Sequence, residues 1–299
     1  MNLNDIEHLL DKYVSVVDAV SLKYQYPDNI KHLLYVIVPA FVVKYGLKRE
    51  HFIIECIDSI PIIITGKEDP RYQALYVSFP YKENTIKTKK KIYLNRYDNI
   101  PFLQLIDNLI HELNHAVNSF KNEITVQDNT FYIRTGLAKT VFNKDNLEII
   151  KKEKTYVLEE IINSKQTELI MNIIMQLKDL KIKDIKIQNT LEAVKNSIDH
   201  KYVSMSYFPS KYYCQELLNN KTFLLTLENL RIEGNIDDIE TWFNGIYGTD
   251  DGYQTLVDLL YQMLQLQNKK GFFVKIKRKD VAIQLVNISK QFNQNCNLR

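Results

Sequence analysis

The stretch that decides the interpretation of the chain is NLIHELNHAVNSF, residues 108 to 120. Two histidines, His111 and His115, stand four residues apart, and Glu112 directly follows the first. Residues four apart lie on one face of a helix, so both imidazoles could hold the same ion. A glutamate after the first histidine then lies near the open position on the metal, where it can take a proton from bound water. The spacing predicts a zinc site with Glu112 as the general base.

The residues around this motif predict the helix that carries it. Asn99 can cap that helix, and Pro101 suits its first turn. Seven apolar residues follow at spacings of three and four and make one wide face: Phe102, Leu105, Ile106, Leu109, Ile110, Leu113 and Val117. HExxH arises by chance in roughly one protein in a hundred of this composition. The alternative is therefore a helix with two surface histidines, but a strongly apolar helix preceded by strands favours a metal site.

The rest of the chain predicts an α+β fold. Short β-rich segments separated by turn residues predict a small sheet, and a hairpin with its turn near Asp128-Asn129 follows the motif. Apolar residues at helical spacing predict a mostly helical chain from about residue 185. The expected strands are 51–57, 60–65, 73–79 and 90–95, and the expected long helices are 2–21, 28–45 and 155–177. Gly46 ends the second of these helices, in which Pro39 predicts a kink or an early end.

We expect the sheet to pack on the motif helix. Residues 1–180 would form the α+β catalytic region with its N-terminal helices, and residues 181–299 a helical C-terminal subdomain packed with it as one unit. Trp242, the single tryptophan, is expected in the core of the helical part.

Composition and charge restrict the possible partners and location. With 299 residues, 45% of them hydrophobic and 25% charged, the chain can bury a core. The net charge is only +3, so positive and negative side chains nearly balance. This balance argues against nucleic acid or an anionic membrane as the main partner, and we expect neither. The N-terminus carries early acids and is not typical of a signal peptide, and the longest apolar run, 33–43, is too short to span a bilayer. These features predict a cytoplasmic protein.

A catalytic zinc site needs a third protein ligand. Cysteine is not its expected source, because Cys56, Cys214 and Cys296 are far apart and form no CxxC pair. The extended HxxGxxH signature of metzincins is absent, since residues 118–121 read Asn-Ser-Phe-Lys. The better source is the helix expected at 155–177, which carries LEEIINSKQTE at 158–168.

With this second segment the chain resembles a gluzincin metallopeptidase, the zincin group whose third zinc ligand is a glutamate on a downstream helix. The resemblance covers about residues 50–180 and implies a zincin-like fold with Glu160 as the third ligand; Asn163 and Thr167 also match the pattern of bacterial members. Ile161 stands where glycine or alanine is usual, and Ser164 where an acidic residue is usual. These departures leave Glu159 as the alternative ligand.

The resemblance also implies how the substrate is handled. Gluzincins add a tyrosine or histidine that donates a hydrogen bond to the oxyanion, and Tyr207 is our first candidate; the others are His200, Tyr212 and Tyr213. The strand expected at 90–95 would form the edge that holds a peptide by backbone pairing. The lysines of NTIKTKKK, at 84–91, would keep a sheet edge soluble, or alternatively bind an acidic substrate.

Together these features predict a zinc metallopeptidase that hydrolyses a peptide or protein substrate, with zinc on His111, His115 and Glu160. Glu112 and Tyr207 would be its catalytic residues. A binding or regulatory protein that keeps the zincin fold without turnover is the alternative, and a helical interaction protein without a metal is a third.

Overall fold

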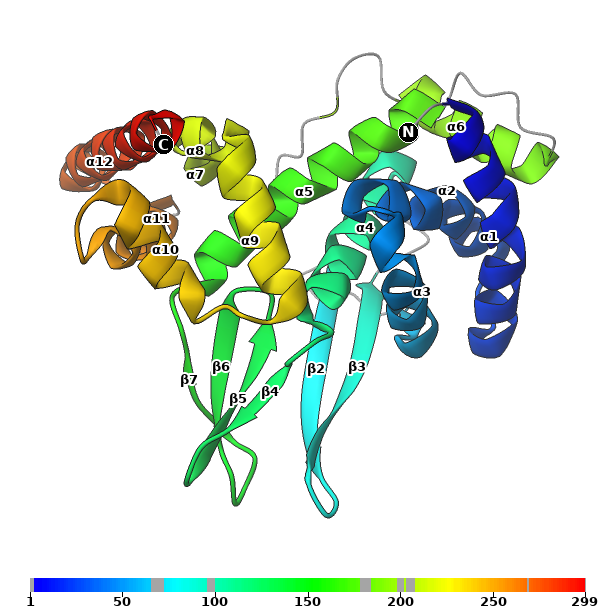
Figure 1. Ribbon diagram of the computed structural model, residues 1–299, viewed down its shortest axis with the longest axis horizontal. Coiled ribbons are helices and arrows are strands. Elements are labelled where there is room, and N and C mark those ends of the chain that lie inside the picture. The colour runs from blue at the N-terminus through cyan, green and yellow to red at the C-terminus, as the bar shows by residue number, and fades with distance from the viewer. Residues whose placement is uncertain are drawn as a thin grey trace. The chain divides into compact units, whose positions relative to one another are not determined.

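The computed structural model describes residues 3–65, 73–95, 100–177, 184–197, 202, 208–267 and 269–298 (Figure 1). Its fold is α+β and mostly helical, with two small sheets in these ranges. The chain divides into two compact units, each built from two segments. Unit 1 comprises Met1–Val117 and Gln166–Ser204, and unit 2 comprises Asn118–Lys165 and Met205–Arg299. The expected division at residue 180 does not coincide with this arrangement, because both units take residues from before and after that point.

The helices of unit 1 surround a core centred on α2. They are α1 (Leu3–Tyr24), α2 (Asp28–Tyr45), the 3-10 helix η1 (Leu47–Arg49), α3 (Glu50–Ser59), α4 (Phe102–Ser119, whose last two residues belong to unit 2), the second part of α5 (Tyr156–Leu177, from Gln166 onward) and α6 (Ile185–Ser197). Every residue of α2 from Leu33 to Val42 is buried. Helix α2 ends at Gly46, as expected, where φ is +89° and the N–H donates to the Val42 carbonyl at 2.8 Å. Pro39 lies inside the helix, so the early end was a wrong alternative.

The segment 51–57 is helical, so the strand predicted there is wrong. It forms α3, whose buried residues are Ile53, Cys56 and Ile57. These three stand at i, i+3 and i+4, which is the spacing of one helix face. The run of β-branched residues suggested a strand, but burial on a single helical face decides the structure here.

The sheet of unit 1 contains the other three predicted strands, as β1 (Ile62–Thr65), β2 (Ala74–Lys82) and β3 (Ile86–Asn95). Their order is β1-β3-β2, with β1 parallel and β2 antiparallel to β3. Ile62, Ile92 and Tyr76 are aligned across the three strands and all are buried. One face of the sheet therefore contributes to the core of unit 1.

Unit 2 contains an antiparallel meander. The strands β4 (Ile124–Val126), β5 (Thr130–Thr135), β6 (Ala138–Asn143) and β7 (Ile149–Lys152) pair in chain order. The hairpin predicted around Asp128-Asn129 is confirmed as β4–β5. Strands β6 and β7 were not predicted.

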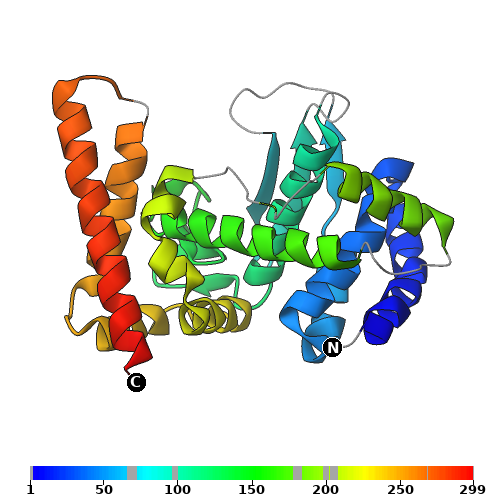
Figure 2. The same cartoon turned by 90° about the horizontal axis from the view of Figure 1, so that it is seen from above.

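The remaining elements of unit 2 are helical. They are the first part of α5 (Tyr156–Leu177), α7 (Phe208–Tyr213), α8 (Gln215–Asn219), α9 (Lys221–Glu233), α10 (Asp238–Tyr247), α11 (Gly252–Gln267) and α12 (Phe272–Asn297). Helices α11 and α12 lie side by side as a hairpin (Figure 2). Trp242 packs against the rings of Phe223 and Phe292, at centroid distances of 6.1 and 5.6 Å. The prediction that the tryptophan belongs to the helical core is confirmed.

None of the helices in the described ranges has, by itself, both the length and the apolar character needed to cross a membrane. The pair formed by Asp28–Tyr45 and Leu47–Ser59 reaches those limits together, with a bend of 113° between its halves.

Candidate metal centre

Helix α4 carries His111 and His115, as predicted, and its buried face is the predicted one. Of the seven apolar residues expected there, all but Phe102 are buried. The Leu105 N–H donates to the Pro101 carbonyl at 2.9 Å, so the helical hydrogen bonds begin at that proline. Asn99, the expected cap, lies outside the described residues. The rings of His111 and His115 have centroids 4.9 Å apart and planes at 80°, and His115 is the more buried of the two.

A third residue groups with these histidines. Ligand atoms of His111, His115 and Glu160 all lie within 4.8 Å of one another, so the three residues could hold a metal ion. Two imidazole nitrogens and one carboxylate oxygen form a donor set that zinc accepts, with the fourth position left for water or substrate. The carboxylate in this group belongs to Glu160, the residue that the resemblance implied.

Glu159, the alternative ligand, is occupied elsewhere. Its carboxylate forms an ion pair with Arg231 and accepts the Leu137 N–H at 2.8 Å. Both charged side chains are buried, at 1% and 0% exposure. If Glu159 moved away to bind a metal, the Arg231 guanidinium would remain buried without a counter-charge, which is energetically costly. Glu159 therefore stabilises the core of unit 2.

Glu112 contacts the sheet of unit 1. Its buried carboxylate accepts the backbone N–H of Tyr76, in β2, at 2.6 Å. The Gln73 carbonyl accepts the Asn95 N–H at 2.7 Å, so the odd-numbered residues of β2 direct their backbone groups toward β3. The even-numbered Tyr76 therefore directs its N–H to the opposite side, since backbone groups alternate along a strand. The candidate general base thus lies along the outer edge of β2.

This arrangement corrects the expectation that residues 90–95 form the substrate-holding edge. From Ile92 to Asn95, strand β3 pairs with β1 on one side, and up to Leu94 it pairs with β2 on the other. Both sides of that segment are used by the sheet itself. The edge that Glu112 contacts belongs to β2.

Asn114, between the two histidines, lies in a buried polar chain that the sequence did not suggest. The Tyr45 hydroxyl donates to Oδ1 of Asn114, and Nδ2 of Asn114 donates to Oε1 of Gln166 at 3.2 Å. Asn114 is fully buried. Since a buried amide needs hydrogen-bond partners, these two hydrogen bonds fix α4 against α2 and the second part of α5.

The departures from the gluzincin pattern have local explanations. Ile161 packs in the hydrophobic core of unit 2, where glycine or alanine would leave a cavity. Ser164 accepts a hydrogen bond from Nζ of Lys211 at 3.1 Å, and both residues are buried. The Ser164 hydroxyl therefore contacts a lysine at the position where the gluzincin pattern has an acidic residue. The matching residues Asn163 and Thr167 are fully buried on α5.

The candidate oxyanion donors are only partly described. Tyr207 and His200 lie outside the residues that the structure describes. Tyr212 and Tyr213 are on α7, with rings 5.4 Å apart, and Tyr212 is exposed. Tyr213 packs against the hydrophobic core of unit 2. The assignment of an oxyanion donor stays a prediction.

Arg134 forms a second buried centre in unit 2, for which the sequence carried no signal. Its Nη1 lies 2.7 Å from the Asn118 carbonyl and 2.9 Å from the carbonyls of Gly136 and Arg231. These carbonyls belong to the end of α4, the β5–β6 turn and α9. One guanidinium therefore joins three segments of unit 2, the last about a hundred residues along the chain from the others.

Gly136 permits the close approach of Glu159 to this turn. Its φ is +57°, and an added Cβ would lie 2.1 Å from the Glu159 carboxylate. Gly136→Ala is therefore expected to destabilise the protein by about 2 kcal/mol more than the positive φ alone would cost, because Glu159 cannot move without breaking its buried pair. Urea denaturation monitored by circular dichroism measures the change.

Gly248→Ala is the matched control in the same unit. Its φ is +92°, and a Cβ there meets nothing within 4 Å. We expect it to lose only about 1 kcal/mol of unfolding free energy, from backbone strain. Equal losses in the two variants would show that contact with Glu159 does not restrict residue 136.

No protein-family model, curated protein or solved structure matches the chain. The resemblance to gluzincins therefore depends on the residues quoted from this chain.

Proposed function

We propose that this protein is a zinc-dependent metallopeptidase of the gluzincin type, with a zincin-like catalytic region. The zinc ligands would be His111, His115 and Glu160, and Glu112 the general base. The observation that carries the proposal is the grouping of three ligand atoms within 4.8 Å on residues that the HExxH spacing and a downstream helix had already indicated.

The chemistry of the donors supports zinc. The group combines two neutral nitrogen donors with one carboxylate, which is the ligand set of peptidases that leave one coordination position open. His115 is buried and His111 and Glu160 are partly exposed.

When bound, zinc would polarise the attacking water and the scissile carbonyl. Glu112 would accept a proton from that water as its oxygen bonds to the carbonyl carbon. The same carboxylate would then return the proton to the amide nitrogen as the carbon–nitrogen bond breaks. The Tyr76 N–H holds one oxygen of Glu112 at 2.6 Å, so the carboxylate is oriented before the substrate arrives.

The position of Glu112 supports a peptide as the substrate. A general base beside the outer edge of β2 would meet a substrate that lies extended along that strand. Tyr207 is the proposed oxyanion donor on the strength of the resemblance alone.

The metal content of the purified protein tests the site. We expect about one zinc per chain by elemental analysis, since the three ligands form a single site. His115→Ala and Glu160→Ala should each lose it on dialysis, because two ligands hold zinc weakly. His51→Ala, which removes an exposed histidine from α3, is the control and should keep it.

Glu159→Gln distinguishes the two candidate third ligands, and we expect this variant to keep zinc. Zinc kept in Glu160→Ala but lost in Glu159→Gln would reassign the ligand. If the parent protein bound no zinc even when zinc was added, the proposed function would be wrong.

A further inference from the structure

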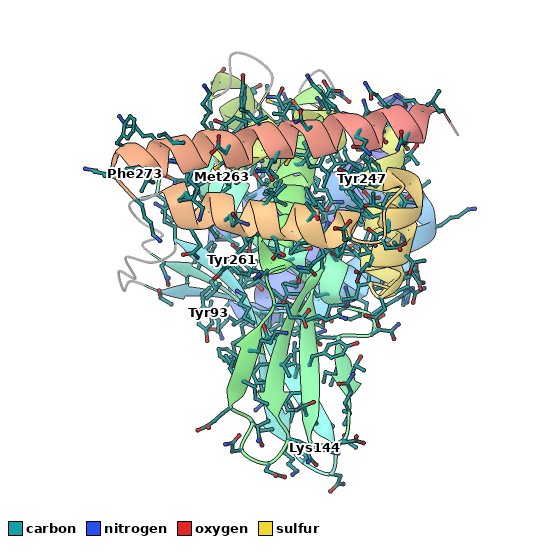
Figure 3. All side chains as sticks on the ribbon, turned by 90° about the vertical axis from the view of Figure 1, so that its left-hand side faces the viewer. Tyr93, Lys144, Tyr247, Tyr261, Met263 and Phe273 are labelled. Carbon is teal, nitrogen blue, oxygen red and sulfur yellow. The ribbon has the colours of Figure 1, made fainter. Side chains whose placement is uncertain are left out.

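The start of α12 exposes large apolar side chains at the end of the α11–α12 hairpin. Phe272 and Phe273 are 72% and 83% exposed, and Ile276 and Ile283 are 44% and 49% exposed. Phe273 is at the tip of the hairpin in Figure 3. Exposed aromatic side chains next to each other are unfavourable in water unless another surface covers them.

The same segment is strongly basic. Residues 269–279 read KKGFFVKIKRK and contain six basic residues and no acidic one. Except for Arg278, whose guanidinium donates to the carbonyls of Gln267 and Lys269 at 3.2 and 3.0 Å, all of these cations are exposed. Positive and negative charges nearly balance over the whole chain, but positive charge is concentrated in this segment.

Exposure and charge are arranged regularly around the helix. The inner face of α12 is buried, with Val281, Leu285 and Ile288 in the core of unit 2. Phe272, Ile276 and Ile283 are spaced by four and seven residues and share the outer face. The outward surface of these first turns is apolar, with lysines beside it.

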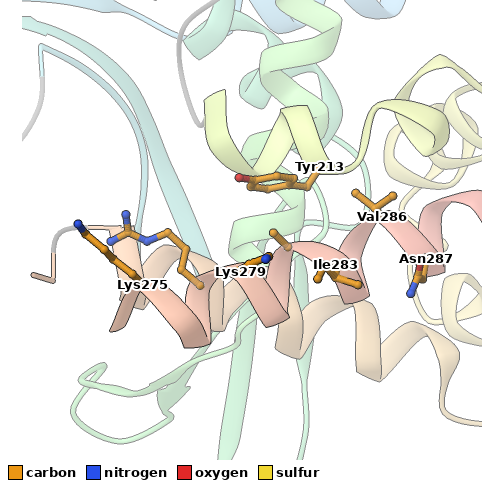
Figure 4. Close-up of a pocket in the computed structure, with 8 residues that line it drawn as sticks. Tyr213, Lys275, Lys279, Ile283, Val286 and Asn287 are labelled. Atoms are coloured by element: carbon orange, nitrogen blue, oxygen red, sulfur yellow. The ribbon is translucent and has the colours of Figure 1, made fainter. Parts of the chain in front are cut away.

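A pocket of about 460 Å³ lies next to this face. Ala282, Ile283 and Val286 form its apolar floor, Lys275 and Lys279 lie at its rim, and Tyr213 of α7 lies opposite (Figure 4). Cations beside an apolar hollow fit a molecule with an anionic head and a hydrocarbon tail.

We propose that the start of α12 docks on an anionic lipid bilayer. Phe272 and Phe273 enter the interfacial layer, the neighbouring lysines contact lipid phosphates, and a headgroup lies against Lys275 and Lys279. This inference is independent of the zinc site and of peptide hydrolysis.

The geometry favours a bilayer over a protein groove. Phe272 and Phe273 are adjacent in a helix and point about 100° apart, so one groove along a helix face cannot cover both. An interface that surrounds the tip covers both at once, while the lysine stems extend along the apolar layer and keep their charges at the phosphates.

Sedimentation with vesicles tests the proposal on the full-length protein. We expect binding to phosphatidylcholine vesicles that contain about 30% phosphatidylserine, and little binding to phosphatidylcholine alone. Raising the salt concentration to about 0.5 M should release the protein, because surface charges are then screened. Equal binding to both vesicle types, or to neither, would overturn the proposal.

Two double variants locate the contact. Phe272→Ser/Phe273→Ser and Lys275→Gln/Lys279→Gln should each lower the partition coefficient by about tenfold. Their controls are Leu22→Ser, which removes another exposed apolar side chain, and Lys151→Gln/Lys152→Gln on β7, and both should bind as the parent does. Undiminished binding by the phenylalanine variant would refute docking at this tip.

Phe273→Trp gives a readout of insertion. We expect its fluorescence to shift to shorter wavelength with anionic vesicles, while Trp242, packed against Phe223 and Phe292, contributes a constant background. If the parent binds no vesicles but self-associates in a manner that the phenylalanine variant abolishes, the tip is a protein interface and the membrane proposal is wrong.

Discussion

Glu112→Gln is expected to keep its zinc and to lose peptide hydrolysis by about a thousandfold or more. The amide keeps the size of the side chain and an oxygen that can accept the Tyr76 N–H, so the local structure should be retained. It cannot take a proton from the attacking water. The measurement combines zinc analysis with cleavage of a peptide library followed by mass spectrometry.

The control is Glu55→Gln, which makes the same substitution at an exposed glutamate of α3. This variant should cleave peptides at the parental rate. Cleavage by Glu112→Gln at the parental rate would contradict the mechanism. A parent that binds zinc but cleaves no peptide in the library would favour the non-catalytic alternative, a binding or regulatory protein that retains the metal.

Arg231→Met is expected to lower the free energy of unfolding by about 3–5 kcal/mol. The substitution leaves the Glu159 carboxylate buried opposite an uncharged side chain, and removing one partner of a buried pair costs more than the pair contributes. Chemical denaturation measures the loss. Lys121→Met breaks the ion pair of Lys121 with Glu233, in which both side chains are 45% exposed, and should cost less than about 1 kcal/mol.

The double variant Arg231→Met/Glu159→Gln separates the charge from the packing. Removing both charges should recover part of the stability, because no uncompensated ion remains. If Arg231→Met cost no more than Lys121→Met, the buried pair would not be a determinant of this core.

Local patterns predicted the elements whose burial follows one period. The buried face of α4 appears in the sequence as apolar residues spaced by three to four, and the strands of the unit 1 sheet appear as short β-rich runs bounded by turn residues. The strand predicted for residues 51–57 was wrong because the prediction followed the β-branched residues and not the helical spacing of Ile53, Cys56 and Ile57. Strand β7 is exposed throughout, so its sequence carries no alternation of burial that could have indicated it. Strand β6 has only its first and fifth residues buried, which is not the alternation of a strand.

The residues that group in the candidate metal centre could be proposed from the sequence because two ligands of one ion require a fixed spacing along a helix. HExxH determines two ligands and a base within one helix, and the resemblance indicated Glu160. The pairing of Glu159 with Arg231 spans 72 residues, and the contact between Arg134 and the Arg231 carbonyl spans 97. No local pattern specifies such partners, because packing in three dimensions selects them.

The interleaving of the two units has a consequence for synthesis on the ribosome. Unit 1 contains residues 166–204, and unit 2 resumes only at residue 205. A nascent chain that has reached residue 165 therefore holds incomplete parts of both units, and the carbonyl of Arg231 that Arg134 contacts has not yet been made. Domains generally fold as units during translation, N-terminal first. Here unit 1 completes its sequence at residue 204. The β4–β7 meander, by contrast, is synthesised long before the α9 residue that Arg134 contacts.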